Sequence, residues 1–239
     1  MKNRQIIRML TLTTCLLATV ALAGPIAHLE NDSSPPITPS SPDKCLTVWC
    51  QEPANLFGIE SQISANPPEV VTQIADFVPA TDEAITMMKW WGGVMQGAGP
   101  VDSFVITFFR SAGCTGPSGE AIYVRSIPSW SEVDLGEGTI EYTATFSAVP
   151  MDAGENYWVS VQALMDIDPG GYWVWHSAEL ELCPAMAKAP SYGILDWTQV
   201  FPFIFPDVPE LVERAFCLYT DGAVTTVAVP WGSLKACYR

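Results

Sequence analysis

The sequence has few of the residues that enzymes commonly use for proton transfer, and few positive charges. Its 239 residues include 2 histidines, and 11 lysines and arginines stand against 26 acidic residues. Gly-x-Ser-x-Gly elbows, phosphate-binding glycine loops, Cys-x-x-Cys redox pairs and histidine-based metal motifs are absent from it. These absences argue against the common hydrolases, nucleotide-binding proteins and redox enzymes, so we expect a protein that is not an enzyme.

The two histidines have no catalytic setting in the sequence. His28 lies in a proline- and serine-rich stretch, and His176 is followed by Ser177 and, further on, by Glu179. Neighbours in sequence do not form a catalytic triad, which is recognised by geometry. We therefore expect His176 to be a structural or surface residue.

Acidic residues are numerous but scattered over predicted turns, as in Glu132, Asp134 and Glu137. A glycoside hydrolase needs two carboxyl groups that face each other across a cleft. The sequence does not pair them, so we expect solvated loop carboxylates and keep a hydrolase as the third hypothesis.

The first residues predict an export signal. Three cations precede an apolar run over residues 9–23, which is too short to span a membrane comfortably. We predict a signal peptide at residues 1–23, with cleavage after Ala23. A lipoprotein signal that ends at Cys15 is the alternative, and it is disfavoured because most of the apolar run would follow the modified cysteine.

Cleavage would remove three of the 11 cations and leave 8 against 26 acids, a formal charge of about −18. Such a charge repels nucleic acids and anionic lipid surfaces and favours solubility. No later stretch is long and apolar enough to span a membrane. We expect a secreted, extracellular protein, with the cell surface as a further location, and with no nucleic acid partner.

Six cysteines follow the predicted signal peptide: Cys45, Cys50, Cys114, Cys183, Cys217 and Cys237. An even number in an exported chain predicts up to three disulfides, and fifteen full pairings are open. Sequence proximity favours the pairs Cys45–Cys50, Cys114–Cys183 and Cys217–Cys237. A zinc site is disfavoured, because the cysteines lack close spacing and nearby histidines.

The chain divides into four parts by composition. After the signal peptide, residues 24–44 are rich in proline and serine and predict a flexible linker. Residues 45–221 are long enough for one domain with a hydrophobic core. Residues 222–239 form a tail that lacks a hydrophobic anchor. Its last nine residues are similar to short tails of other exported bacterial proteins; an edge strand is favoured there over a sorting tag.

The central part shows the period-two pattern of β-strands. In Thr139–Ser147, Ile140, Tyr142, Ala144 and Phe146 alternate with polar residues. Glycine- and proline-containing turns separate such segments, which predicts an all-β fold, an antiparallel β-sandwich or jelly-roll-like single domain. A helical turn is expected at Glu210–Arg214, and a turn at Gly92–Gly93. The other expected strands are Ile85–Trp91, Phe104–Phe109, Ala121–Ile127, Tyr157–Ala163, Tyr172–His176 and Ala215–Thr220.

Tryptophan is the residue type that gives a binding hypothesis. Trp91, Trp158, Trp173 and Trp175 lie in predicted strands, and outward-facing tryptophans stack against sugar rings. Trp91 shares a strand face with Lys89, and Trp158 shares one with polar residues, so both are expected to face outward. A partner polysaccharide, or another cell-surface component, follows from this hypothesis. The alternative is that the 184–214 segment or other loops cover these side chains.

A structural calcium site is the cofactor hypothesis. Asp166 and Asp168 alternate before a Pro-Gly-Gly turn, an arrangement that directs carboxylate oxygens toward one hard cation. The third acid and the terminal glutamate of an EF-hand are missing, so a plain acidic turn with no cofactor is favoured.

Six short motifs occur in a characteristic order: Trp49–Pro53, Ile74–Phe77, Ile85–Thr86 with Trp91–Gly92, Tyr157–Gln162, Tyr172–Trp175 and Ala215–Phe216. Together they resemble a family of secreted bacterial β-sandwich domains of unknown function, often found with C-terminal anchoring signals. The resemblance covers residues 48–221 and implies a sandwich in an extracellular setting, without an established activity. The chain departs from the family in keeping one acid, Asp76, where two are usual, and Glu52 in place of a proline.

These observations rank three functions. The first is a non-catalytic extracellular structural or adhesive module held together by disulfides. The second is a carbohydrate-binding module that uses exposed tryptophans, and the third is a glycoside hydrolase.

Overall fold

A computed structural model describes residues 47–97, 99–179, 182–199 and 212–220. Within these residues the chain forms two β-sheets that pack face to face, which confirms the predicted all-β sandwich. The predicted signal peptide (1–23), linker (24–44) and tail (222–239) lie outside the described residues, as do Cys45 and Cys237. Among the helices of the described ranges, none is both long enough and apolar enough to cross a bilayer.

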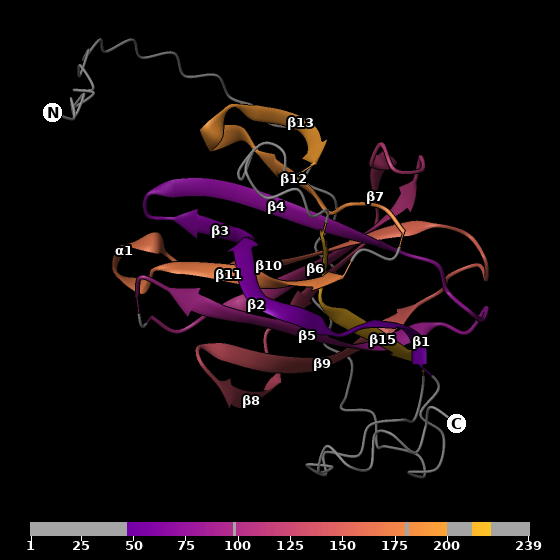
Figure 1. Ribbon diagram of the computed structural model, residues 1–239, viewed down its shortest axis with the longest axis horizontal. Coiled ribbons are helices and arrows are strands. Elements are labelled where there is room, and N and C mark those ends of the chain that lie inside the picture. Colours follow the sequence, from indigo (N-terminus) through magenta and orange to yellow (C-terminus); the bar gives the residue numbers. More distant parts are fainter. Residues whose placement is uncertain (1–46, 98, 180–181, 200–211, 221–239) are drawn as a thin grey trace, which may run out of the picture.

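One sheet has eight strands, with the order β1–β15–β5–β11–β14. Strand β9 pairs with the other edge of β5, β8 pairs with β9, and β2 pairs with β11. Figure 1 shows β8 at one end of the fold, beyond β9. The strands of this sheet are β1 (Thr47–Gln51), β2 (Pro53–Glu60), β5 (Ile85–Met95), β8 (Ser131–Gly136), β9 (Thr139–Val149), β11 (Tyr172–Glu179), β14 (Val212–Arg214) and β15 (Phe216–Thr220).

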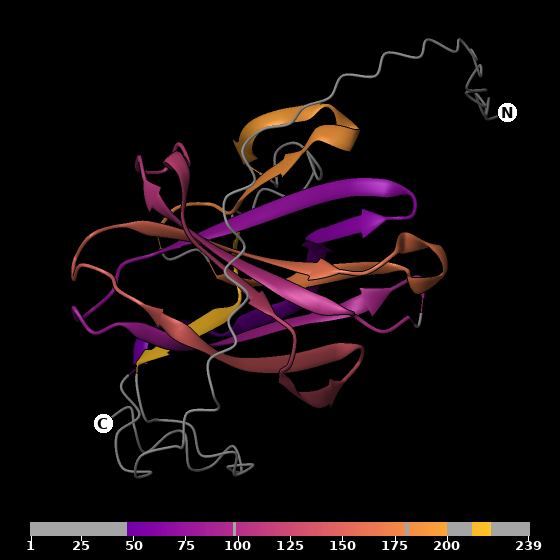
Figure 2. The same ribbon diagram turned by 180° about the vertical axis from the view of Figure 1, so that it is seen from behind.

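The second sheet has seven strands, in the order β13–β12–β4–β3–β10–β6–β7. Strands β3 and β10 pair in parallel, and β10 also pairs with β4 in the antiparallel sense. The β12–β13 ribbon lies at the end of the fold opposite to β8, as seen from both sides (Figures 1 and 2). The strands are β3 (Gln62–Ala65), β4 (Pro68–Phe77), β6 (Ser103–Ser111), β7 (Pro117–Ile127), β10 (Tyr157–Leu164), β12 (Met186–Ala189) and β13 (Ile194–Gln199).

Two short helical turns complete the described structure. The turn α1 (Ile167–Gly170) joins β10 to β11, and the 3₁₀ turn η1 (Pro190–Tyr192) joins β12 to β13. Neither turn contributes a residue to the main hydrophobic core.

The predicted strand faces are confirmed. Tyr142, Ala144 and Phe146 of β9 lie in the main hydrophobic core, with Ile140 packed against it. The apolar faces predicted for β6 and β10 line the same core. Because successive side chains of a strand point to opposite faces, the alternation in the sequence determined which residues the two sheets bury between them.

Aromatic rings fill much of the space between the sheets. Trp90 stacks on Tyr142 at a centroid distance of 5.7 Å, and both meet the edge of Phe104 at 5.0 Å. A second group surrounds Phe77, whose ring lies 5.7 Å from Tyr157 and 6.1 Å from Phe216. Offset and edge-on aromatic pairs of this kind add to the stabilisation that burial alone provides.

The Gly92–Gly93 pair does not form the predicted turn, because it lies within β5. A Cβ atom on Gly92 would come within 2.5 Å of the Trp173 ring, and one on Gly93 within 2.1 Å of the Gly138 carbonyl oxygen. These glycines are therefore needed for close packing of the neighbouring strand and turn, a role that the sequence does not distinguish from a turn.

The expected helical turn at Glu210–Arg214 is also wrong for its described part. Residues 212–214 form β14, which pairs with the end of β11 through Arg214 and Ser177. Pairing with a strand that precedes it by more than thirty residues overrides the local preference of this segment.

Candidate functional site

The four tryptophans proposed as a sugar-binding platform are buried. Trp91 is 5% exposed, and Trp158, Trp173 and Trp175 are 0% exposed. Trp173 and Trp175 point between the sheets into the main core, and Trp175 donates a hydrogen bond from Nε1 to the Ala215 carbonyl oxygen at 2.9 Å. A buried ring cannot stack on a sugar, so the hypothesis of exposed tryptophans is wrong for these four residues.

Trp91 and Trp158 do leave the main core, as predicted, but other parts of the chain contact them. Trp158 packs in a second apolar cluster with Ile74, Cys183 and Met186, and Trp197 packs against that cluster. Trp91 lies in a third cluster with Ala178, Ala215 and Cys217. For Trp158, the structure bears out the alternative in which the 184–214 segment covers the outward face.

The structure contains two disulfides among its described residues. Cys114 is bonded to Cys183, as predicted, and Cys50 is bonded to Cys217. The predicted Cys45–Cys50 and Cys217–Cys237 pairs are therefore wrong. The reason is strand pairing: β1 lies against β15 with Cys50 directly opposite Cys217, although 167 residues separate them.

Asp166 holds a turn through hydrogen bonds. Its Oδ1 atom accepts the backbone N–H groups of Ala65 and Asn66 at 3.0 and 2.9 Å. The Asp168 carbonyl oxygen accepts a hydrogen bond from the Asn66 side chain at 3.4 Å. In the described ranges, no three His, Cys, Asp or Glu side chains come together as a metal site. The calcium hypothesis stays a prediction, and Asp166 has a structural task without it.

We expect Asp166→Ala to lower the free energy of unfolding by about 1–2 kcal/mol, because two backbone donors of the β3–β4 turn lose a charged acceptor. Urea denaturation of the two proteins, with and without a calcium chelator, measures both roles. The chelator should leave the wild-type midpoint unchanged. A wild-type midpoint that falls on chelation, with no such fall in the variant, would instead support bound calcium.

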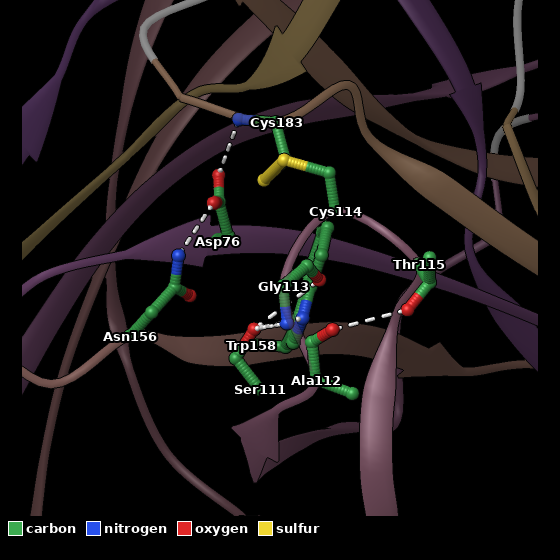
Figure 3. Close-up of a disulfide and its surroundings, with 9 residues drawn as sticks. All are labelled: Asp76, Ser111, Ala112, Gly113, Cys114, Thr115, Asn156, Trp158 and Cys183. Atoms are coloured by element: carbon green, nitrogen blue, oxygen red, sulfur yellow. Dashed lines mark hydrogen bonds between the residues drawn. A yellow bond between two sulfur atoms is a disulfide. The ribbon is translucent and has the colours of Figure 1, made fainter.

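Two buried carboxyl groups face each other where the sheets meet at one edge. Asp76 on β4 and Glu213 on β14 are both 0% exposed, and β14 packs against β4. The Asp76 carboxylate accepts hydrogen bonds from the Cys183 N–H and from Asn156 Nδ2, both at 3.2 Å (Figure 3). The Glu213 carboxyl group lies beside Asp76, and burial together with this neighbour raises the pKa of Glu213 well above its usual range.

Arg214 is buried next to this pair. Its Nη1 donates to Ser177 Oγ at 3.1 Å, while Nε and Nη2 have no hydrogen-bond partner in the described part of the chain. Burial lowers the pKa of Arg214 to about 10, although the neighbouring Glu213 opposes the shift. His176 is 4% exposed, and burial and the charge of Arg214 both lower its pKa. The histidine is thus a neutral structural residue.

A second acidic group lies nearer the surface. Glu60 of β2 and Glu69 of β4 are half-buried, and the phenol of Tyr192 on η1 lies beside both carboxyl groups. Burial and the negative charge of Glu69 raise the pKa of Glu60 to about 7. Tyr192 itself is 56% exposed. The cluster therefore combines a carboxyl group that titrates near neutral pH with an accessible aromatic side chain.

The raised pKa of Glu60 predicts a pH-dependent stability. Because the folded state binds this proton more tightly, its stabilising effect is complete below pH 4.5 and is lost as the pH rises through about 7. We expect wild type to lose about 1–2 kcal/mol more than Glu60→Gln over this range, after allowance for solvent screening. Urea denaturation at several pH values measures the difference, and parallel curves for the two proteins would contradict it.

Comparison with known proteins adds no relative. No family model, curated protein or solved structure matches the chain.

Sequence reasoning missed Glu60, Glu69, Tyr192 and Glu213. They come from four separate elements and share no local motif. Asp76 carried a usable signal, since it stands between Ala75 and Phe77 in an apolar strand, where an ionisable side chain needs a partner.

Proposed function

We propose that the chain is a non-catalytic structural or adhesive module that acts outside the cytoplasm. The observation that carries the proposal is the pair of disulfides, which join segments 167 and 69 residues apart. Disulfides persist in oxidising compartments and are rare in the cytosol. The location outside the cytoplasm is consistent with them, and with the predicted signal peptide.

The distribution of the disulfides supports a load-bearing role. Cys50–Cys217 links β1 to β15, the first and last described strands, and Cys114–Cys183 links the β6–β7 loop to the segment that leads into β12. Each therefore closes a large part of the sandwich into a covalent loop. The same features support the proposed membership in the secreted sandwich-domain family that the sequence motifs resemble.

Fractionation and attachment assays test this function. We expect the protein, detected by antibody, outside the cytoplasm of the producing bacterium, with no free thiols at Cys50, Cys114, Cys183 and Cys217. We also expect a deletion strain to lose surface attachment or envelope integrity, restored by the wild-type gene. Cytoplasmic retention with reduced cysteines would overturn the proposed location, and an unchanged deletion strain would overturn the role.

Carbohydrate binding is the second candidate function. The residue now proposed to stack on the sugar is Tyr192, in place of the buried tryptophans. An exposed aromatic ring beside two carboxyl groups is the combination that sugar sites use for stacking and for hydroxyl hydrogen bonds. A glycan array should then show binding by wild type and Tyr192→Phe, which keeps the ring, and none by Tyr192→Ala. Equal binding by all three proteins would exclude this site.

The same assay separates binding from hydrolysis. Release of shortened glycans by wild type, lost in Glu60→Gln and in Glu69→Gln, would show that the two carboxyl groups act as an acid–base pair. That outcome would overturn the non-catalytic proposal.

A further inference from the structure

Asp76 connects three segments to strand β4. Its two oxygens accept hydrogen bonds from the Cys183 N–H and the Asn156 side chain (Figure 3), and its carboxyl group faces Glu213 of β14. Cys183 belongs to the disulfide that anchors the segment leading into β12. The contact between Asp76 and Glu213 is therefore a point where the eight-stranded sheet is fastened to the seven-stranded sheet.

This contact requires a proton. Both oxygens of Asp76 already accept hydrogen bonds, whereas the donor beside the Glu213 carboxyl group is the main chain of Asp76, whose effect on the pKa of Glu213 is smaller than the opposing effects of burial and of the Asp76 carboxylate. Two ionised carboxylates in contact inside a protein repel each other, and burial deprives both of the water that would screen the repulsion. A neutral Glu213, by contrast, donates its O–H to Asp76, so a hydrogen bond takes the place of the repulsion between two carboxylates.

The surrounding charges do not remove this requirement. Arg214 follows Glu213 on β14 and its charge lowers the pKa of Glu213, but burial and the Asp76 carboxylate outweigh this effect, and the bonded Arg214 nitrogen donates to Ser177 on β11. His176 on β11 lies near Arg214 and is neutral. On the segment that leads into β12 and on the loop before β10, the groups that contact Asp76 are the uncharged Cys183 N–H and Asn156.

We propose that one proton shared between Asp76 and Glu213 fastens β14 to β4, and that this edge of the sandwich loosens when the pH rises far enough to remove it. The proton holds the two strands together, so the module is most tightly closed in acidic surroundings. Removal of the proton leaves two buried negative charges, and β14 separates from β4 to hydrate them. The Ala215 N–H bond to the His176 carbonyl oxygen at 2.9 Å lies at the end of β14 and would open with it.

Linkage gives the direction of the effect. The folded state binds the Glu213 proton more tightly than the unfolded state, so stability falls with pH above the ordinary value of 4.5 and until the folded-state pKa is passed. The unfolding equilibrium constant of the oxidised full chain should rise up to tenfold per pH unit from this one group.

Glu213→Gln provides the test. Glutamine has the shape of a protonated glutamate and keeps an N–H donor toward Asp76, but it cannot ionise. In urea denaturation between pH 5 and 9, the variant should fold. Its unfolding free energy should lack the part of the pH dependence that the Glu213 proton contributes. Glu60→Gln, which removes a separate titration with a pKa of about 7, and the exposed Glu120→Gln are matched controls. The same dependence in Glu213→Gln as in wild type would overturn the proposal.

An infrared measurement tests the proton even if the variant does not fold. The spectrum of the wild-type protein at pH 5 should contain the carbonyl band of a protonated carboxylic acid that resists exchange with solvent. Raising the pH should remove this band together with the slow exchange of the Ala215 amide. Absence of the band at pH 5, or fast Ala215 exchange while the band persists, would contradict a proton-held contact.

Discussion

The Cys50→Ser, Cys217→Ser double variant is expected to lose about 5 kcal/mol of unfolding free energy, the larger of the two disulfide effects. A disulfide restricts the conformations of the unfolded chain, and the entropy that the unfolded chain loses grows with the length of the closed loop. Cys50 and Cys217 are separated by 167 residues and the other pair by 69. The same relation gives about 4 kcal/mol for Cys114→Ser, Cys183→Ser. Urea denaturation of the three oxidised proteins measures both values.

Peptide mapping supplies the control for this prediction. Proteolysis without reduction should release one linked fragment that contains Cys50 and Cys217 and another that contains Cys114 and Cys183. A fragment that links Cys45 to Cys50 would contradict the strand pairing between β1 and β15. A double variant at Cys50 and Cys217 that is as stable as wild type would show that loop closure is not what this disulfide contributes.

The sequence predicted the sandwich and its buried faces because these depend on a local pattern. In β9 and β10, alternating apolar residues lie within a few positions of each other, and every second side chain points the same way. Trp90 and Trp91 show the same logic, since the first lies in the main core and the second outside it. Periodicity therefore identifies the face on which a residue lies.

Periodicity does not identify what lies on that face. Trp158 shares its outward face with polar residues, yet Cys183, Met186 and Trp197 cover it, and they come from a segment about 25 to 39 residues later. The disulfide pairing failed for a related reason. Nearness in sequence favoured Cys45–Cys50, whereas the long-range pairing of β1 with β15 determines that Cys217 is the partner of Cys50.

The two clusters of acidic residues could not be predicted from the sequence. Glu60 and Glu69 meet through Tyr192, and Asp76 meets Glu213 across the two sheets, so each group needs tertiary contacts that no spacing encodes. Both groups raise a carboxyl pKa by the same physical cause, burial next to another acid. They differ in access, because the Tyr192 group reaches solvent and the Asp76 group does not.

Trp158→Ala is expected to lose about 3–5 kcal/mol of unfolding free energy, because it leaves a cavity the size of an indole ring in a fully buried cluster. The Trp158 ring is 0% exposed, and its Nε1 donates to Ser111 Oγ at 3.1 Å. Trp158 also pairs across the strands with Asp76 and packs in the cluster that contains Cys183. The substitution should therefore loosen the attachment of Asp76 and of the segment that leads into β12. Urea denaturation measures the loss.

Trp158→Phe separates packing from ligand contact. It retains most of the buried apolar area and loses the hydrogen bond to Ser111, so its stability should lie between wild type and Trp158→Ala. Any binding to polysaccharide should be unchanged in Trp158→Phe, because a residue that β12 and β13 cover has no path to a sugar. If Trp158→Phe kept full stability and lost glycan binding, this tryptophan would be a ligand contact, and the cover over it would have to open in solution.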